Sequence, residues 1–204
     1  MSVYKEIFDK NIARVNSLCI LYNSLRSSAK EEKDNKFTDI LRSAIVFLHS
    51  SFEEYFRSVL RDILPVTCTQ EDLQKIPFTT SEGKHLEKIT VSNLFQYKGK
   101  TVEEVLALFI SDTLDTTSFN NYTDIVNWAK KIKVDLSEFA SQEKIDKMIH
   151  RRHKIVHEAD NTTKDKMTIA TYTLAPIKDT TVTEWTKAVQ DLVNIIDAQI
   201  EGDK

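Results

Sequence analysis

Glycine, proline and cysteine are scarce in this sequence. Its 204 residues include three glycines, three prolines and two cysteines. Sheet-rich folds need many tight turns, so the lack of glycine and proline favours long helices joined by few loops. Cys19 and Cys68 are too few for a disulfide framework or a thiolate zinc site. We expect both to pack as small apolar groups in a reducing compartment.

Long apolar runs are also missing. No run approaches the roughly 20 residues that span a bilayer. The N-terminal stretch MSVYKEIFDKN carries acids early and lacks the apolar run of a signal peptide. We therefore expect a cytoplasmic protein with no membrane partner. Hydrophobic residues make up 41% of the chain and charged residues 29%, which suffices for a core and a solvated surface.

An excess of positive charge gathers in one stretch of the chain. The net charge is -3, which argues against a protein that coats nucleic acid along a broad track. Residues 147–157 carry four lysines and arginines and no acid, so this stretch holds +4 and the rest of the chain -7. One basic spot on an acidic body indicates a focused anion site.

Hydrophobic periodicity predicts an all-α fold. Apolar residues recur at helical spacing in four long segments, which predict a bundle of about four long helices: residues 3–27, 37–64, 141–159 and 181–200. Pro65 is expected to end the second helix. Thr181 and Glu184 have the spacing of a capping box that would begin the last one.

The whole chain, residues 1–204, is predicted to be a single domain with an insert of short helices at about 66–135, between the second and third long helices. Thr101 and Glu104 resemble a capping box that opens a helix to about residue 111, and a further helix is predicted over 121–132. Residues 167–174 are rich in threonine and β-branched side chains and are expected to be extended.

An arginine interrupts the apolar face of the third long helix. Ile145, Met148, Ile149, Arg152 and Val156 share one stripe on the helical period. A lone buried guanidinium is costly, so this arginine must meet an anion, an interface or water.

Arg152 is followed five residues later by His157. In an ideal helix the two side chains point about 140° apart. A histidine can move protons near neutral pH, and an arginine can hold two phosphate oxygens. Together they suffice to cleave RNA without a metal, because RNA supplies the 2′-hydroxyl as its own nucleophile. The alternative is a structural arginine and a histidine paired with the last carbonyls of the helix.

The segment Arg152-His-Lys-Ile-Val-His157 resembles the R-x4-H motif of the HEPN superfamily, in which a polar residue follows the arginine. His153 satisfies that position, and Ile155 with Val156 matches the usual RxxIVH form. The segment HSSFEEYFR at 49–57 is similar to the helix that faces the motif in larger stand-alone HEPN proteins. TVTEWTKAVQDLVNIIDAQI is similar to their closing helix.

This resemblance implies a metal-independent endoribonuclease with no cofactor, active as a homodimer whose two motifs face each other. It implies a toxin or an antiviral defence effector, with an RNA substrate and an antitoxin or defence-system partner. Arg152 would orient and stabilise the phosphate, His157 would be the acid–base residue, and the products would be a 2′,3′-cyclic phosphate and a 5′-hydroxyl. A non-catalytic HEPN module that binds RNA, nucleotide or a protein partner is the alternative.

Four further residues are candidates for supporting roles: His153, Arg151, Glu53 and His49. Arg151 offers an R-x5-H spacing with the same histidine, and we expect it to be solvated. Glu53 can be an acid that supports the site residues from behind. We favour the alternative, in which Glu53 and Glu54 are both exposed and form ion pairs with Arg57. His49 can line the same cleft or sit as a satisfied polar residue at the edge of the core.

Two other readings stay open. His150, His153 and His157 form a stripe that could bind zinc or nickel, but the adjacent lysine and arginines would repel a cation, so we expect no metal. A nucleotidyltransferase antitoxin could modify a tyrosine behind the motif. Tyr172 lies fifteen residues beyond His157, which weakens that reading.

Overall fold

The computed structural model describes residues 1–28, 37–74, 76, 90–162 and 173–202. Of these residues 78% are helical and none lies in a strand, which confirms the predicted all-α fold. The one β-type contact among them is an isolated antiparallel bridge between Asn161 and Leu174. Tyr172 and most of the segment expected to be extended, 167–174, lie outside the described residues.

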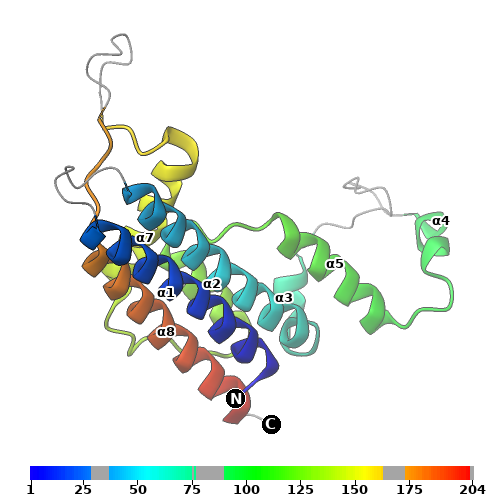
Figure 1. Cartoon of the computed structure of the whole chain (residues 1–204). Helices are drawn as coiled ribbons and strands as arrows, with labels where there is room; N and C mark the ends of the chain where they lie inside the picture. Colours follow the sequence, from blue (N-terminus) through cyan, green and yellow to red (C-terminus); the bar gives the residue numbers. More distant parts are fainter. Residues whose placement is uncertain (29–36, 75, 77–89, 163–172, 203–204) are drawn as a thin grey trace.

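Four long helices form the bundle, as predicted (Figure 1). They are α1 (Val3–Ser28), α2 (Thr38–Thr67), α7 (Gln142–Glu158) and α8 (Asp179–Gly202). α2 is the central element, because it contacts α1, α7 and α8. Within the described residues no helix is long and apolar enough to cross a membrane.

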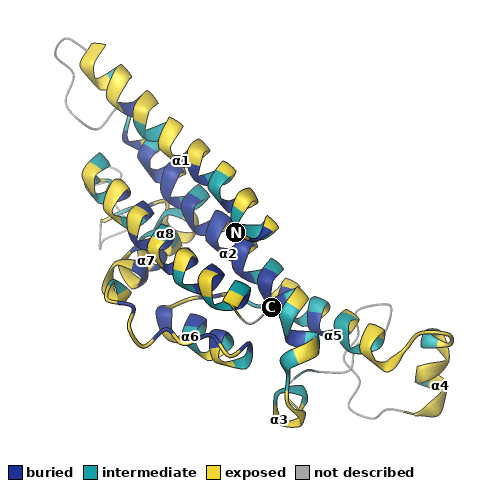
Figure 2. Cartoon of the chain, turned by 90° about the horizontal axis from the view of Figure 1, so that it is seen from below, coloured by how far each residue is buried: buried dark blue, intermediate teal, exposed yellow. Residues whose placement is uncertain are grey.

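α2 is central because apolar side chains cover most of its circumference. Figure 2 shows α2 mostly dark blue and teal, whereas α1 and α8 turn an exposed face outward. The side chains of α2 that are completely excluded from solvent are Leu41, Ala44, Ile45, Leu48, Phe56, Val59 and Leu60. Removing this apolar surface from water supplies the main driving force for the bundle.

Shorter helices fill the chain between α2 and α7, as predicted: α3 (Gln70–Leu73), α4 (Val91–Leu94), the 3-10 helix η1 (Phe95–Tyr97), α5 (Val102–Thr116) and α6 (Tyr122–Lys131). The capping box of Thr101 and Glu104 is present at the start of α5, and this helix runs five residues further than expected. Figure 1 shows α5 and α4 reaching away from the bundle. α6 is tied to α7, because the Tyr122 N–H donates to the Asp146 carboxylate at 2.7 Å.

Two predicted helix boundaries are wrong. Pro65 does not end α2, which continues to Thr67. A proline in the last turn removes only its own N–H bond, and the Cys68 N–H still donates to the Leu64 carbonyl at 2.9 Å. The predicted capping box of Thr181 and Glu184 is absent because α8 already begins at Asp179, which places both residues inside the helix.

Candidate functional site

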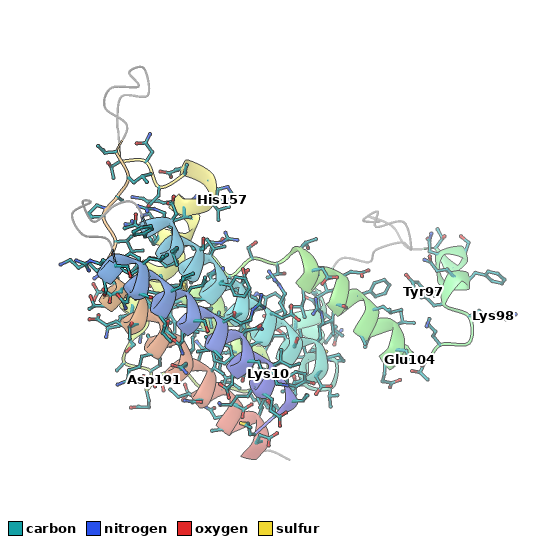
Figure 3. All side chains as sticks on the ribbon, viewed as in Figure 1. Lys10, Tyr97, Lys98, Glu104, His157 and Asp191 are labelled. Atoms are coloured by element: carbon teal, nitrogen blue, oxygen red, sulfur yellow. The ribbon has the colours of Figure 1, made fainter. Side chains whose placement is uncertain are left out.

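α7 carries both residues of the candidate site on different sides. Ile145, Met148 and Ile149 are buried and face the bundle core. Arg152 follows one turn later on the same side and is half-buried. His157 lies in the last turn of the helix and is exposed. Figure 3 shows its side chain at the end of the bundle where α2 begins, which we call the open end of the bundle.

Arg152 has neither a hydrogen bond nor an ion pair within the described residues. Its Nε atom is shielded from solvent and meets no partner. Its positive charge lies close enough to His49 of α2 to lower the pKa of that histidine. The half-buried guanidinium of Arg152 thus adjoins α2, and the described part of the chain offers it no carboxylate partner.

Three polar residues of α2 form a buried cluster beside Arg152. The Glu53 carboxylate lies 3.5 Å from His49 Nδ1 and 3.3 Å from Arg57 Nη2. Arg57 Nη2 also donates to the Thr117 carbonyl at 2.8 Å, which ties α2 to the chain after α5. The His49 Nδ1 atom has no hydrogen-bond partner and is sealed from solvent.

The electrostatic setting keeps His49 neutral. Burial lowers its pKa from the ordinary value of 6.5, and the charges of Arg152 and Arg57 lower it further. The Glu53 carboxylate and a hydrogen bond with the backbone of Phe119 act in the opposite direction without outweighing the burial. His49 is therefore an uncharged imidazole at neutral pH, packed against two cations and one anion.

Glu53 differs from what the sequence suggested. It bridges Arg57, as expected, but its side chain is only 11% exposed, so the predicted exposed pair with Glu54 is wrong. Glu54 alone faces solvent, where it accepts a hydrogen bond from Ser58. Glu53 is buried because α2 is covered on several sides, and its charge is matched by Arg57.

The three histidines of α7 lie on its exposed side. His150, His153 and His157 are all exposed, and the rings of His153 and His157 contact each other with centroids 4.5 Å apart. No group of three or more histidine, cysteine, aspartate or glutamate side chains that could hold a metal ion is found in the described ranges.

Arg151 is not solvated, contrary to the prediction from sequence. Its side chain is 18% exposed, and one nitrogen, Nη2, donates to Asp160 Oδ2 at 2.7 Å, to the Ala175 carbonyl at 2.8 Å and to the Pro176 carbonyl at 3.2 Å. All three of these hydrogen bonds come from one nitrogen. Because Arg151 already binds groups of its own chain, the R-x5-H spacing does not place a free arginine beside His157.

Sequence reasoning missed Asp160 and Arg42, which complete this cluster. Arg42 Nε donates to the same Asp160 oxygen at 2.7 Å, and the two residues lie 118 positions apart in the chain. Such a distant pair leaves no periodic signal. The available hint was local: Asp160 is an acid directly after a helix end that is rich in cations.

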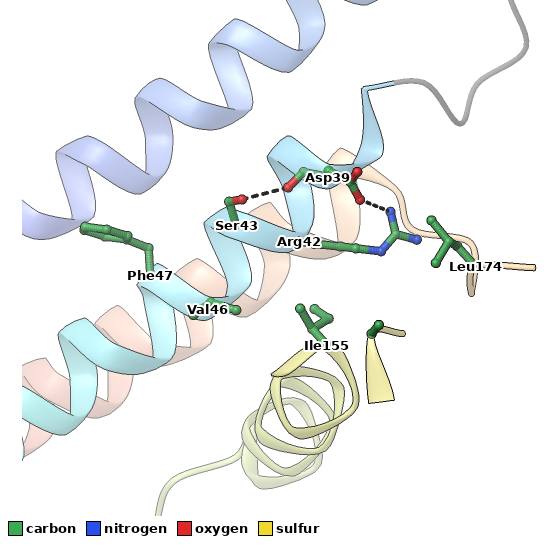
Figure 4. Close-up of a pocket in the computed structure, with 8 residues that line it drawn as sticks. Asp39, Arg42, Ser43, Val46, Phe47, Ile155 and Leu174 are labelled. Atoms are coloured by element: carbon green, nitrogen blue, oxygen red, sulfur yellow. Dashed lines mark hydrogen bonds and ion pairs between the residues drawn. The ribbon is translucent and has the colours of Figure 1, made fainter. Parts of the chain in front are cut away.

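A cavity of about 550 Å³ lies between the first turns of α2 and the end of α7 (Figure 4). Val46, Phe47 and Ile155 give it an apolar wall, and Arg42 with Asp39 lies at its polar end. Ile155 also packs against the core. The cavity adjoins the helix turn that carries His157.

Comparison with known proteins gives one positive finding. A family model described as RiboL-PSP-HEPN matches residues 9–202, which is nearly the whole chain. None of the curated proteins and none of the solved structures matches it.

Proposed function

Because the chain belongs to the RiboL-PSP-HEPN family, and so to the HEPN superfamily, we propose that it is a metal-independent endoribonuclease whose site consists of Arg152 and His157. Membership supports an RNase or a nucleotide-binding module. The chemistry of the two side chains favours the first.

The observation that carries the proposal is the unpaired state of Arg152. Arg42 and Arg151 share the Asp160 carboxylate, and Arg57 has Glu53. Arg152 alone among these four has no anion within the described residues, although its Nε atom is sealed from solvent. A half-buried cation without a partner costs stability, so an external anion such as a phosphate is the ligand that this position fits.

The reaction needs only the substrate and these side chains. The 2′-oxygen of RNA attacks the adjacent phosphorus, and the bond from phosphorus to the 5′-oxygen breaks. A neutral His157 imidazole takes up the proton of the 2′-hydroxyl, and a protonated imidazole, from the same or a second copy, gives a proton to the 5′-oxygen. Arg152 stabilises the charge that builds on the phosphoryl oxygens. The products are a 2′,3′-cyclic phosphate and a 5′-hydroxyl.

Incubation of the purified protein with RNA in the presence of EDTA tests this proposal. Cleavage should continue without metal. His157→Ala should lower the rate by about 10²–10⁴-fold, as for loss of a general acid or base, and Arg152→Ala by about 10²–10³-fold. Arg152→Lys should also fail, because an ammonium cannot hold two phosphate oxygens in a fork. His150→Ala, an exposed histidine on the same helix, is the matched control.

A single 2′-deoxy substitution at the cut site should block cleavage there, since it removes the nucleophile. Cleavage that survives this substitution, or that stops with EDTA, would contradict the 2′-hydroxyl route. A protein that cuts no RNA but binds RNA or nucleotide through Arg152 would be the non-catalytic module instead.

We also propose that the nuclease acts in the cytoplasm as a toxin or an antiviral effector, together with an antitoxin or a defence-system protein. The family match supports contact with RNA in general. The identity of such a partner is a question for the neighbouring genes.

A further inference from the structure

The helix that carries the site ends in a strained conformation. α7 stops at Glu158, and the next two residues, Ala159 and Asp160, have backbone φ angles of 48° and 56°. An alanine adopts this left-handed region only at a cost of about 1–2 kcal/mol, whereas an aspartate tolerates it better. Two in succession persist only where the surrounding structure holds them.

The Asp160 side chain fixes these two residues in place. It is 1% exposed, and its Oδ2 atom accepts one hydrogen bond from Arg42 Nε and one from Arg151 Nη2, both at 2.7 Å. Its backbone is fixed as well, because its N–H donates to the Lys154 carbonyl at 3.0 Å. The Asp160 carbonyl accepts from the Ala175 N–H, also at 3.0 Å.

The two arginines connect three parts of the chain. Arg42 comes from α2, and Arg151 comes from α7 itself. Both donate to the Ala175 carbonyl, at 2.7 and 2.8 Å. Arg42 is itself held by the Thr38 hydroxyl at 2.7 Å. The end of α7 is therefore tied to the start of α2 and to the chain that leads into α8.

We propose that Asp160, clamped between Arg42 and Arg151, is a positioning residue that holds His157 at its place in the last turn of α7. The inference rests on the proposed function for its kinetic consequence. His157 lies only three residues before Asp160, whereas Arg152 follows the buried residues Met148 and Ile149 by one turn. Loss of the clamp lets the strained residues relax, and the last turn moves with His157 while Arg152 stays.

Asp160→Asn is the first test, because asparagine also tolerates the left-handed conformation, while it removes the charge and replaces one acceptor oxygen with an NH2 donor. We expect kcat to fall on the order of 10²-fold, as for a small misplacement of a reacting group, with KM nearly unchanged because Arg152 still meets the phosphate. The ring Cε1–H resonance of His157 in a histidine NMR spectrum should shift, while that of His150 should not.

A pair of lysine substitutions supplies the second test. Arg151 makes all its bonds through one nitrogen, which a lysine ammonium with its three donors can replace. Arg42 uses three different nitrogens, toward Asp160, Thr38 and Ala175, which a single ammonium cannot reproduce. Arg151→Ala should therefore lower kcat, Arg151→Lys should restore it, and Arg42→Lys should remain impaired.

Two outcomes would overturn the positioning role. One is an Asp160→Asn protein that melts earlier yet keeps its kcat and the wild-type His157 resonance, since the cluster would then serve stability alone. The other is Arg42→Lys performing as well as Arg151→Lys. If the wild-type protein cuts no RNA, the proposed function fails, and the His157 resonance still decides whether the clamp positions that side chain.

Discussion

Two consecutive arginines in α7 have opposite surroundings. Arg151 reaches a buried carboxylate and two carbonyl groups, so its charge is matched within the chain. Arg152 lies near the core side and has no such partner within the described residues. The first stabilises the native structure, and the second is a half-buried cation whose lack of an anion within the described residues costs stability.

Replacing Arg152 with leucine should abolish RNA cleavage without lowering stability. The change removes an unpaired, half-buried cation and adds apolar contact, so we expect the free energy of unfolding to stay equal or to rise by about 0.5–1 kcal/mol. Thermal unfolding followed by circular dichroism measures this.

Arg151→Ala is the matched comparison. Removal of one partner of a buried ion pair costs about 3 kcal/mol, the low end of the usual range, because Asp160 keeps Arg42. The melting temperature should fall by roughly 2–4 °C for each kcal/mol lost in a chain of this size. An Arg152→Leu protein that melts below Arg151→Ala would show that Arg152 is a structural residue.

His49 should make stability depend on pH. Burial holds its pKa in the folded protein below the ordinary 6.5, so the unfolded chain binds more protons as pH falls below that value. Stability is then fully present above pH 6.5 and decreases as pH falls toward the pKa of the folded state. Urea unfolding at pH 7.5, 6.5 and about 5.5 should reveal this loss.

The same measurement tests the neighbours of His49. Arg152→Leu removes a charge that lowers the His49 pKa, so its stability should depend less on pH than that of the wild type. His49→Phe should depend on pH least, and the exposed His150→Gln should behave as the wild type does. Identical slopes in all four proteins would refute the coupling between His49 and Arg152.

At the scale of the element, α7 is a helix whose two ends have different constraints. Its first half is held by buried apolar side chains, and its last turn carries only exposed or half-buried ones. The position of that turn depends on the cap formed by Ala159 and Asp160. The clamp of Asp160, Arg42 and Arg151 therefore holds the end of α7, where buried apolar side chains are absent.

Ala159→Gly should stabilise the protein. Ala159 has φ 48° and ψ 31°, a left-handed conformation that glycine adopts without the steric cost of a Cβ atom. After allowance for the greater entropy of glycine in the unfolded chain, we expect a gain of roughly 0.5–1 kcal/mol. A rise in melting temperature with unchanged cleavage would support this, and a fall would show that the alanine side chain contributes packing.

At the scale of the whole molecule, one chain does not bring its two candidate residues to a single point. Arg152 lies beside α2, and His157 points to solvent at the open end of the bundle (Figure 3). A second copy related by two-fold symmetry could supply the complementary residue. We therefore propose a homodimer with each site built from both chains.

Mixing two inactive variants tests the shared site. Arg152→Ala keeps His157, and His157→Ala keeps Arg152, so a mixed dimer restores one complete site when the residues act across the interface. Activity should recover to about a quarter of the wild-type value, since half of the dimers are mixed and each keeps one intact site. Sedimentation at micromolar concentration should show the dimer. Failure of the mixture to recover, with dimers present, would place both residues of a site in one chain.

The arrangement of helices followed from the sequence because its signals are local. Apolar residues at helical spacing, with little glycine or proline, marked α1, α2, α7 and α8 to within a few residues. The same helical spacing predicted that Arg152 lies on the core side of α7. That residues 1–204 form one domain stays a prediction.

The surroundings of the charged residues were decided only by the tertiary structure. Nothing within one turn of Arg151 distinguishes it from a solvated arginine, because its partners, Asp160 and Ala175, reach it only after the chain has reversed direction. Glu53 is buried for a similar reason, since α2 is covered by other helices. Helical periodicity is a property of neighbouring residues, whereas burial and ion pairing depend on what packs opposite, and the Arg42–Asp160 contact joins residues 118 positions apart.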